Sequence, residues 1–249
     1  GDGTFTNRIN EMLDHTSHFS MGNDIADLNN DGLMDIFTLD MLPEDNKRQK
    51  LLMAPDNYEK FEFGLKMGFH HQYMRNMLHL NHGNGSFSET GQMSGVSNTD
   101  WSWAALLADF DNDGLKDLFI TNGYARDYTN QDFLKYMADY LKNNKNGLRR
   151  DNILDLVHQM PSSDLTNYIY KNTNGWIFEE KIKAWGLEQK VNSNGAAYAD
   201  LDNDGDLDLV TNNVNHLASI YRNNTDSLSQ KNNFLKLKLQ GSGLNSFGI

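Results

Sequence analysis

The chain has 249 residues, of which 38% are hydrophobic and 11% aromatic, so it is long enough to bury one large core or two smaller ones. It contains no cysteine, which excludes disulfides and thiolate metal sites. Its formal net charge is −12, so binding to a nucleic-acid backbone is not expected, and no apolar run is long enough to span a membrane.

The predicted elements form a repeating pattern along the chain. Residues 1–40 are expected to be a partial blade that ends in an acidic loop and a strand, and residues 41–76 an insertion. Residues 77–122 are expected to be a complete blade, in the order strand, glycine turn, strand, strand, acidic loop, strand. Four short antiparallel strands in a stretch of this length are typical of a propeller blade.

The second half of the chain repeats this order. Residues 126–165 are predicted to be a helical insertion because apolar residues recur there at helical spacing, and residues 168–213 a further blade. Residues 218–230 are expected to start a next strand or a linker, and residues 233–249 another domain. The predicted fold is mostly β, a β-propeller segment of four-stranded antiparallel blades that carry acidic loops and helical insertions. A closed propeller needs about four to eight blades, so we expect this chain to be a segment of a longer propeller of about seven.

The same acidic loop occurs three times. Each copy has oxygen-bearing side chains at positions 1, 3, 5 and 9, which suits a hard cation that binds six to eight oxygens. Glycine at position 6 permits the sharp turn around an ion, so we predict three Ca²⁺ sites. Their side-chain ligands are Asp27, Asn29, Asp31 and Asp35, then Asp109, Asp111, Asp113 and Asp117, and finally Asp200, Asp202, Asp204 and Asp208. At position 7, the residues expected to bind through the backbone carbonyl are Leu33, Leu115 and Asp206.

These loops differ from an EF-hand, which needs flanking helices and a bidentate Glu at position 12. Position 12 holds Thr38, Ile120 and Thr211, and the residues after each glycine alternate as in a strand. A turn rich in Asp and Asn that binds no ion is the alternative. Repulsion among several carboxylates within a few ångström disfavours that alternative.

The loops and the strands after them resemble FG-GAP/VCBS repeats, which also build the propellers of integrin α-subunits. The stretch 84–123 is similar to repeats of the cartilage-acidic-protein/UnbV (ASPIC/UnbV) class, which is abundant in Bacteroidetes surface proteins. Residues 233–249 resemble the opening strand of an UnbV-type domain, although Phe247 stands where that family usually shows Arg. The resemblance implies a multidomain protein that is secreted or lipid-anchored at the bacterial outer membrane. It carries calcium ligands over to the three loops and implies no catalytic residue.

Two other groups of side chains have a functional and a structural interpretation. The first group is a set of four histidines, whose imidazole rings could bind a transition metal. Because no further ligand follows them at fixed spacing, the sequence favours histidines that only form hydrogen bonds. These histidines are His70, His71, His79 and His82. Tryptophans stack on sugars, but aromatic residues in blade strands more often form the core between blades. The tryptophans are Trp101, Trp103, Trp176 and Trp185.

The sequence favours a non-enzymatic binding or scaffold module, because the Asp clusters are assigned to calcium and no catalytic motif remains. By analogy with the family, its partner is a protein or glycan at the cell surface, or an outer-membrane nutrient-uptake complex. One alternative is a calcium-assisted polysaccharide lyase with Tyr73, His71 or Arg75 beside the ion. The other is an integrin-like adhesion module. Loops of this kind match millimolar calcium, which indicates an extracytoplasmic location.

Overall fold

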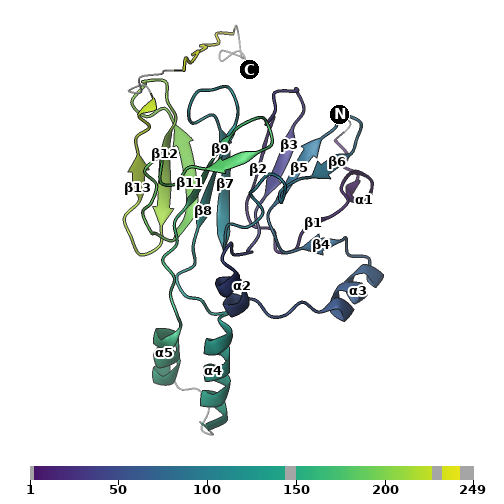
Figure 1. Ribbon diagram of the computed structural model, residues 1–249, viewed down its shortest axis with the longest axis vertical. Helices are drawn as coiled ribbons and strands as arrows, with labels where there is room; N and C mark the ends of the chain where they lie inside the picture. The colour runs from purple at the N-terminus through teal and green to yellow at the C-terminus, as the bar shows by residue number, and fades with distance from the viewer. Residues whose placement is uncertain (1–2, 144–149, 226–231, 242–249) are drawn as a thin grey trace.

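The fold is described for residues 3–143, 150–225 and 232–241 of a computed structural model, and it is mostly β with all but the first helix at one end (Figure 1). The helices are α1 (Ile9–Met12), α2 (Asn46–Leu52), α3 (Tyr58–Lys66), α4 (Gln131–Asn143) and α5 (Arg150–Gln159). The strands are β1 (Thr16–Ser17), β2 (Asn23–Ala26), β3 (Asp35–Thr38), β4 (Gln72–Tyr73), β5 (Met77–Asn81), β6 (Phe87–Glu89), β7 (Ser102–Ala108), β8 (Asp117–Asn122), β9 (Tyr168–Asn172), β10 (Phe178–Glu180), β11 (Ser193–Ala199), β12 (Asp208–Asn213) and β13 (Ser219–Tyr221).

Three antiparallel sheets carry the fold. Their strand orders are β2-β3-β5-β6, β7-β8-β9-β10 and β11-β12-β13, and a short parallel pair joins β1 to β4. Strand β7 packs between β2 and β11, so the first strands of the three sheets are neighbours. Antiparallel sheets with adjacent first strands are arranged as the blades of a propeller are. Within the described residues they do not close into a ring.

The sheets correct the predicted blade boundaries. The ranges 77–122 and 168–213 do not each form one sheet, because β5 and β6 pair with the earlier β2 and β3, and β9 and β10 pair with β7 and β8. Each of the first two sheets therefore joins the two strands around an acidic loop to the two strands that follow the next insertion. The insertions 41–76 and 126–165 thus lie between the second and third strands of a sheet, not after its last strand.

Strand β8 shows why these residues form the middle of a sheet. All of its residues are buried, and its sequence is rich in branched and aromatic side chains. Leu118 and Ile120 lie in a core shared with the first sheet, whereas Phe119 lies in a core shared with the third. Because side chains alternate along a strand, this one strand packs against both neighbouring sheets.

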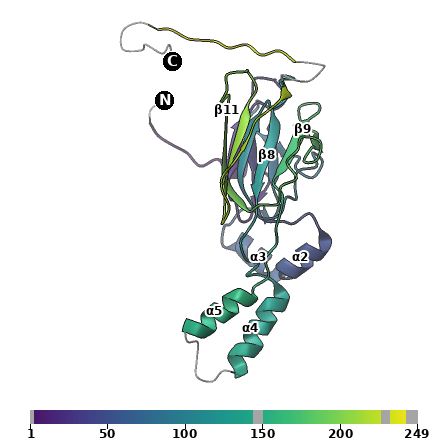
Figure 2. The same ribbon diagram turned by 90° about the vertical axis from the view of Figure 1, so that its left-hand side faces the viewer.

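The acidic loops and the insertions lie at opposite ends of the sheets (Figures 1 and 2). Each acidic loop connects the first and second strands of its sheet, so the second strand carries the chain away from the loop. The insertions begin where β3 and β8 end, and they return to the same end to enter β5 and β9. The inserted helices α2 to α5 are therefore at the end remote from the loops.

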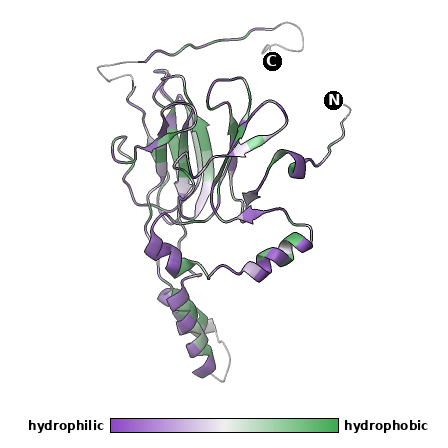
Figure 3. Cartoon of the chain, turned by 45° about the vertical axis from the view of Figure 1, so that its right-hand side comes forward, coloured by the Kyte–Doolittle hydropathy of each residue, from purple (hydrophilic) through white to green (hydrophobic). Residues whose placement is uncertain are grey.

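Polar side chains cap the N-termini of three inserted helices. The carboxylate of Asp45 accepts a hydrogen bond from Arg48 N at 2.8 Å, and Asn57 caps α3 in the same way at 2.9 Å. Asn130 accepts from Phe133 N at 3.0 Å at the start of α4. Figure 3 shows hydrophobic residues concentrated on the strands, while the helices carry residues of both kinds. Among the described residues, none of the helices combines the length and the hydropathy that crossing a membrane requires.

The C-terminal segment crosses the loop end of the sheets. Asn232 donates to the backbone carbonyl of Asp111 at 2.8 Å, and Lys236 Nζ lies 3.4 Å from a carboxylate oxygen of Asp200. Over residues 233–241 the predicted opening strand of a further domain has no strand partner, and 242–249 lie outside the described residues. The predicted segment 218–230 begins with β13, which is the third strand of the third sheet, and its residues 226–230 are likewise not described.

Candidate metal centre

The three acidic loops occupy equivalent places, between β2 and β3, β7 and β8, and β11 and β12. In each loop the Asn at position 4 and the Gly at position 6 adopt positive φ, which these residue types tolerate best. The angles are 59° and 84° in the first loop, 56° and 95° in the second, and 64° and 97° in the third. The matching sequences therefore produce one local fold three times.

The carboxylate of the position-1 aspartate accepts hydrogen bonds from backbone N–H groups later in the same loop in two of the three loops. In the second loop, Asp109 accepts from Asp113 N at 3.0 Å and from Gly114 N at 2.8 Å. Asp27 makes the corresponding bonds in the first loop, at 3.1 and 2.9 Å. In the third loop, Asp200 Oδ1 is buried and accepts no hydrogen bond from the described residues. A buried acceptor without a donor suits a cation, since such groups otherwise destabilise a fold.

The position-9 aspartate anchors each loop to its sheet. Asp35, Asp117 and Asp208 are almost fully buried, with exposed fractions of 0%, 0% and 2%. Asp117 accepts from Phe110 N at 3.0 Å and from Asn172 N at 2.9 Å, and the other two make the equivalent pair of bonds. Burial raises the pKa of Asp117 to about 7, although the amide hydrogen bonds oppose the shift. A nearby cation would favour the ionised carboxylate.

Two loops bring three carboxylates together. Ligand atoms of Asp109, Asp111 and Asp117 lie within 4.8 Å of one another, as do those of Asp200, Asp202 and Asp204. Both triads could hold a metal ion. The first loop has Asn29 at position 3, and its three aspartates do not meet that distance among the described residues. The position-7 residues donate their N–H to the position-5 aspartate at 2.8–3.1 Å, and ligation through their carbonyls stays a prediction.

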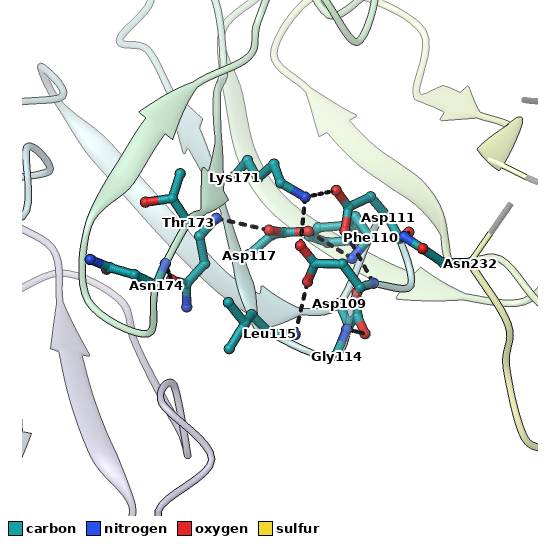
Figure 4. A network of polar contacts seen from close by, with 12 residues as sticks. Asp109, Phe110, Asp111, Gly114, Leu115, Asp117, Lys171, Thr173, Asn174 and Asn232 are labelled. Carbon is teal, nitrogen blue, oxygen red and sulfur yellow. Dashed lines mark hydrogen bonds and ion pairs between the residues drawn. The ribbon is translucent and has the colours of Figure 1, made fainter. Parts of the chain in front are cut away.

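Basic side chains contact the second and third loops. Lys171, on β9, contacts the carboxylate of Asp111 and lies 2.6 Å from Asp113 Oδ2 (Figure 4). Burial lowers the pKa of Lys171, but its contacts with the two aspartates outweigh burial and raise the pKa above its ordinary value. Arg222 lies 2.7 Å from Asp202. These ion pairs show that the loop oxygens attract positive charge.

Sequence reasoning missed a repeated asparagine. Asn81, Asn172 and Asn223 each follow or end the third strand of a sheet, and each donates its backbone N–H to the position-9 aspartate. Each side-chain amide also donates to the position-8 carbonyl of the same loop. Asn172 and Asn223 reach the preceding loop as well, at its position-2 carbonyl. The signal was present in the sequence as an Asn at the same place in three units.

The repeat is also visible in comparison with known families. Residues 69–120 and 148–211 match the FG-GAP-like repeat family. The two FG-GAP-like repeats include the second and third acidic loops, and the first loop lies outside the matched residues. No curated protein matches the chain. The predicted FG-GAP resemblance is thus confirmed for this part of the chain, whereas the ASPIC/UnbV class and a Bacteroidetes origin stay predictions.

The four histidines do not converge on one point. His70 Nε2 lies 2.9 Å from the carbonyl of Leu13, His79 Nε2 lies 3.0 Å from that of His15, and His82 Nε2 lies 2.7 Å from a serine hydroxyl. In the described part of the chain, the groups with metal-ligand spacing are the acidic triads alone. His70, His79 and His82 therefore have the hydrogen-bonding roles that the sequence favoured, while the ring of His71 contacts those of His70 and Phe61.

The tryptophans pack rather than line a groove together. Tyr124 stacks on Trp101 with ring centroids 4.6 Å apart and on Trp103 at 6.3 Å. Trp185 packs against the core between the second and third sheets. The core interpretation is thus supported for Trp185, whereas Trp101 and Trp103 stack on Tyr124 outside the two core clusters.

The side chains suggested as a lyase base do not reach the loops. Arg75 Nη2 lies 2.9 Å from Glu89 and 3.0 Å from the ring of His15, and Tyr73 packs against His15 and Phe61. His71 packs near Phe61 with ring centroids 6.2 Å apart. Among the described residues, these three side chains have no contact with an acidic loop.

Proposed function

We propose that this chain is part of a calcium-stabilised, extracytoplasmic β-propeller that acts as a non-enzymatic binding or scaffold module. The observation that carries the proposal is the acidic loop repeated at equivalent places in three neighbouring sheets, two of them within FG-GAP-like repeats. Calcium at each loop joins the first two strands of a sheet and neutralises their clustered carboxylates.

The donor set favours calcium over other metals. The loops offer carboxylate, amide and carbonyl oxygens, and they contain neither histidine nor cysteine. Hard oxygen donors suit Ca²⁺ and Mg²⁺, whereas transition metals prefer imidazole or thiolate. A loop in which residues at five positions offer oxygens fits the variable coordination of Ca²⁺ better than the strict octahedron of Mg²⁺.

The partner surface in this proposal is at the opposite end from calcium. The insertions place exposed apolar side chains there, such as Tyr136, Leu141 and Leu154. Loops and helices on a rigid sheet scaffold commonly carry binding residues. We propose a cell-surface protein or glycan as the partner, with an outer-membrane uptake complex as the specific case that the UnbV resemblance implies.

Adhesion through calcium is the second candidate. The Asp202 side chain, at position 3 of the third loop, is 38% exposed, so a bound cation could also meet a carboxylate from a partner. A polysaccharide lyase has less support, because Tyr73, His71 and Arg75 contact other residues.

Calcium titration of the purified chain by calorimetry tests the proposal. We expect about three ions to bind, with dissociation constants of roughly 10⁻⁴–10⁻³ M as in extracellular modules, and Mg²⁺ to bind more weakly. Absence of heat and of any calcium-dependent rise in melting temperature would contradict it. Formation of unsaturated products from a uronate polysaccharide would overturn the non-enzymatic assignment.

A further inference from the structure

The three acidic loops differ in their number of carboxylates. Position 3 is Asn in the first loop and Asp in the other two, and position 7 is Asp in the third loop alone. The first loop therefore has three aspartates, the second four and the third five. Carboxylate count by itself would predict that the third loop attracts Ca²⁺ most strongly.

Basic side chains offset this difference. Among the described residues, no Lys or Arg lies within 4.0 Å of an aspartate oxygen of the first loop. Lys171 contacts the second loop, and Arg222 and Lys236 contact the third. Lys116, inside the second loop, makes no such ion pair. If only the aspartates and the basic side chains in contact with them are counted, the formal charges are −3 + 0, −4 + 1 and −5 + 2, which is −3 for each loop.

One position at the end of the third strand, which we call the third-strand position, differs between the first loop and the other two, and Lys236 from the C-terminal segment adds a second contact to the third loop. Lys171 directly precedes Asn172, whose backbone N–H donates to Asp117 at 2.9 Å. Arg222 has the same relation to the position-9 aspartate of the third loop, through Asn223. In the first sheet the equivalent residue is Leu80, which precedes Asn81.

We propose that Lys171 and Arg222 are intrinsic counter-cations that compete with Ca²⁺ for the second and third loops. The residue at this third-strand position, and not carboxylate count alone, then sets the calcium affinity of each loop. The inference rests on the proposed calcium binding.

Competition follows from the shared oxygens. Lys171 contacts Asp111 and Asp113, the ligands at positions 3 and 5, and it lies over the second loop in Figure 4. Calcium bound to those oxygens at about 2.3–2.6 Å would be within a few ångström of the ammonium group, and the two cations would repel. The Lys171 side chain is 26% exposed, whereas that of Arg222 is 59% exposed. Solvent screening therefore makes the effect larger for Lys171.

The test isolates the second loop and changes the charge of Lys171. The double variant D31A/D204A removes the position-5 ligands of the other two loops. Adding K171M removes the charge and keeps the unbranched stem, and we expect calcium to bind about tenfold more tightly in calorimetry. K171R, which keeps the charge, should stay near the parent value. K181M is the matched control, because Lys181 is 22% exposed and pairs with Glu179 at 2.6 Å, away from the loops.

The reciprocal change tests the first loop. In D113A/D204A, where the first loop keeps its ligands, L80K should weaken calcium binding about tenfold relative to L80Q, which likewise removes the packing of Leu80 against the core. If K171M fails to fold, this L80K experiment still tests the proposed competition between a basic side chain and Ca²⁺.

The outcomes separate the two proposals. No calcium binding by the unmodified chain contradicts the proposed function. Calcium binding that is unchanged or weaker in K171M, or unchanged in L80K, overturns the competition while leaving calcium binding intact.

Discussion

A single buried asparagine connects neighbouring repeats at the residue scale. Asn172 is fully buried, and its side-chain amide donates to Leu28 in the first loop at 3.0 Å and to Lys116 in the second at 3.1 Å. Its side-chain oxygen accepts from Gly175 N at 2.7 Å. One side chain therefore satisfies backbone groups from three segments, which explains why Asn recurs at this place.

Replacing Asn172 with Ala should lower the free energy of unfolding by about 2–4 kcal/mol, because several buried backbone groups lose their partners. Urea denaturation measures this change. Asn224→Ala is the control, since Asn224 is exposed and makes one long bond of 3.4 Å. Equal effects of the two substitutions would contradict the connecting role.

Glu89 makes stability depend on pH. Burial opposes its ionisation, but hydrogen bonds from Arg75, Gly91 and His15 outweigh burial and hold the pKa of Glu89 below its ordinary 4.5. A carboxylate with a lowered folded-state pKa stabilises the protein above the unfolded-state pKa, and this contribution is lost as pH falls through the folded-state value.

Glu89→Gln should therefore be less stable than the unmodified chain by about 1–3 kcal/mol at pH 7. The difference should shrink below about pH 4.5, where the unfolded-state carboxyl takes up its proton. Denaturant midpoints at pH 7 and at lower pH measure it. A difference that stays constant with pH would refute the ionic contribution.

At the element scale, one arginine joins the two insertions. Arg48 on α2 contacts Asp100 before β7, lies 3.2 Å from Asp127 at the start of the second insertion, and donates to Ser163 at 2.7 Å. The three charged side chains are 15% exposed or less. Removing a partner from a buried network leaves uncompensated charge, which is strongly destabilising.

Arg48→Met should destabilise the helical end by about 3 kcal/mol or more. Hydrogen exchange should show faster opening of α2 and α4, while the core strand β8 stays protected. Lys47→Met has the same change in charge on an exposed neighbour and should behave as the unmodified chain does. Unchanged exchange in Arg48→Met would show that the insertions are held by other contacts.

The calcium-loop hairpin is the other element with a direct test. Asp113→Ala removes the position-5 ligand of the second loop, and one calcium ion per chain should be lost. Metal analysis after gel filtration in calcium measures the count. An unchanged count would refute the ligand assignment.

At the scale of the whole molecule, the acidic loops proposed to bind calcium lie at one end of the sheets, and the insertions lie at the other (Figure 1). Binding to the folded state alone stabilises it by mass action, so chelation with EDTA should lower the melting temperature, and added Ca²⁺ should restore it. The first strands β2, β7 and β11 should gain protection from hydrogen exchange more than α4 and α5 do. Equal gains throughout would contradict a local action of calcium at the loops.

The sequence by itself determined the acidic loops, the strands after them and the helices of the second insertion. These features depend on local chemistry, namely oxygen donors at fixed spacing, glycine at a sharp turn and the periodicity of apolar residues. Such signals are contained within about ten residues, so tertiary contacts rarely override them.

Only the tertiary structure decided which strands share a sheet and which side chains reach the loops. Strand β9 pairs with β8 across the whole second insertion, and this pairing brings Lys171 and Asn172 onto the second loop. Burial of Leu118 and Phe119 on opposite faces places β8 between two sheets, but it does not determine which strand pairs with β8 within its own sheet. Pairing between distant segments leaves no local pattern, which is why the blade boundaries were misplaced and the basic partners of the loops were missed.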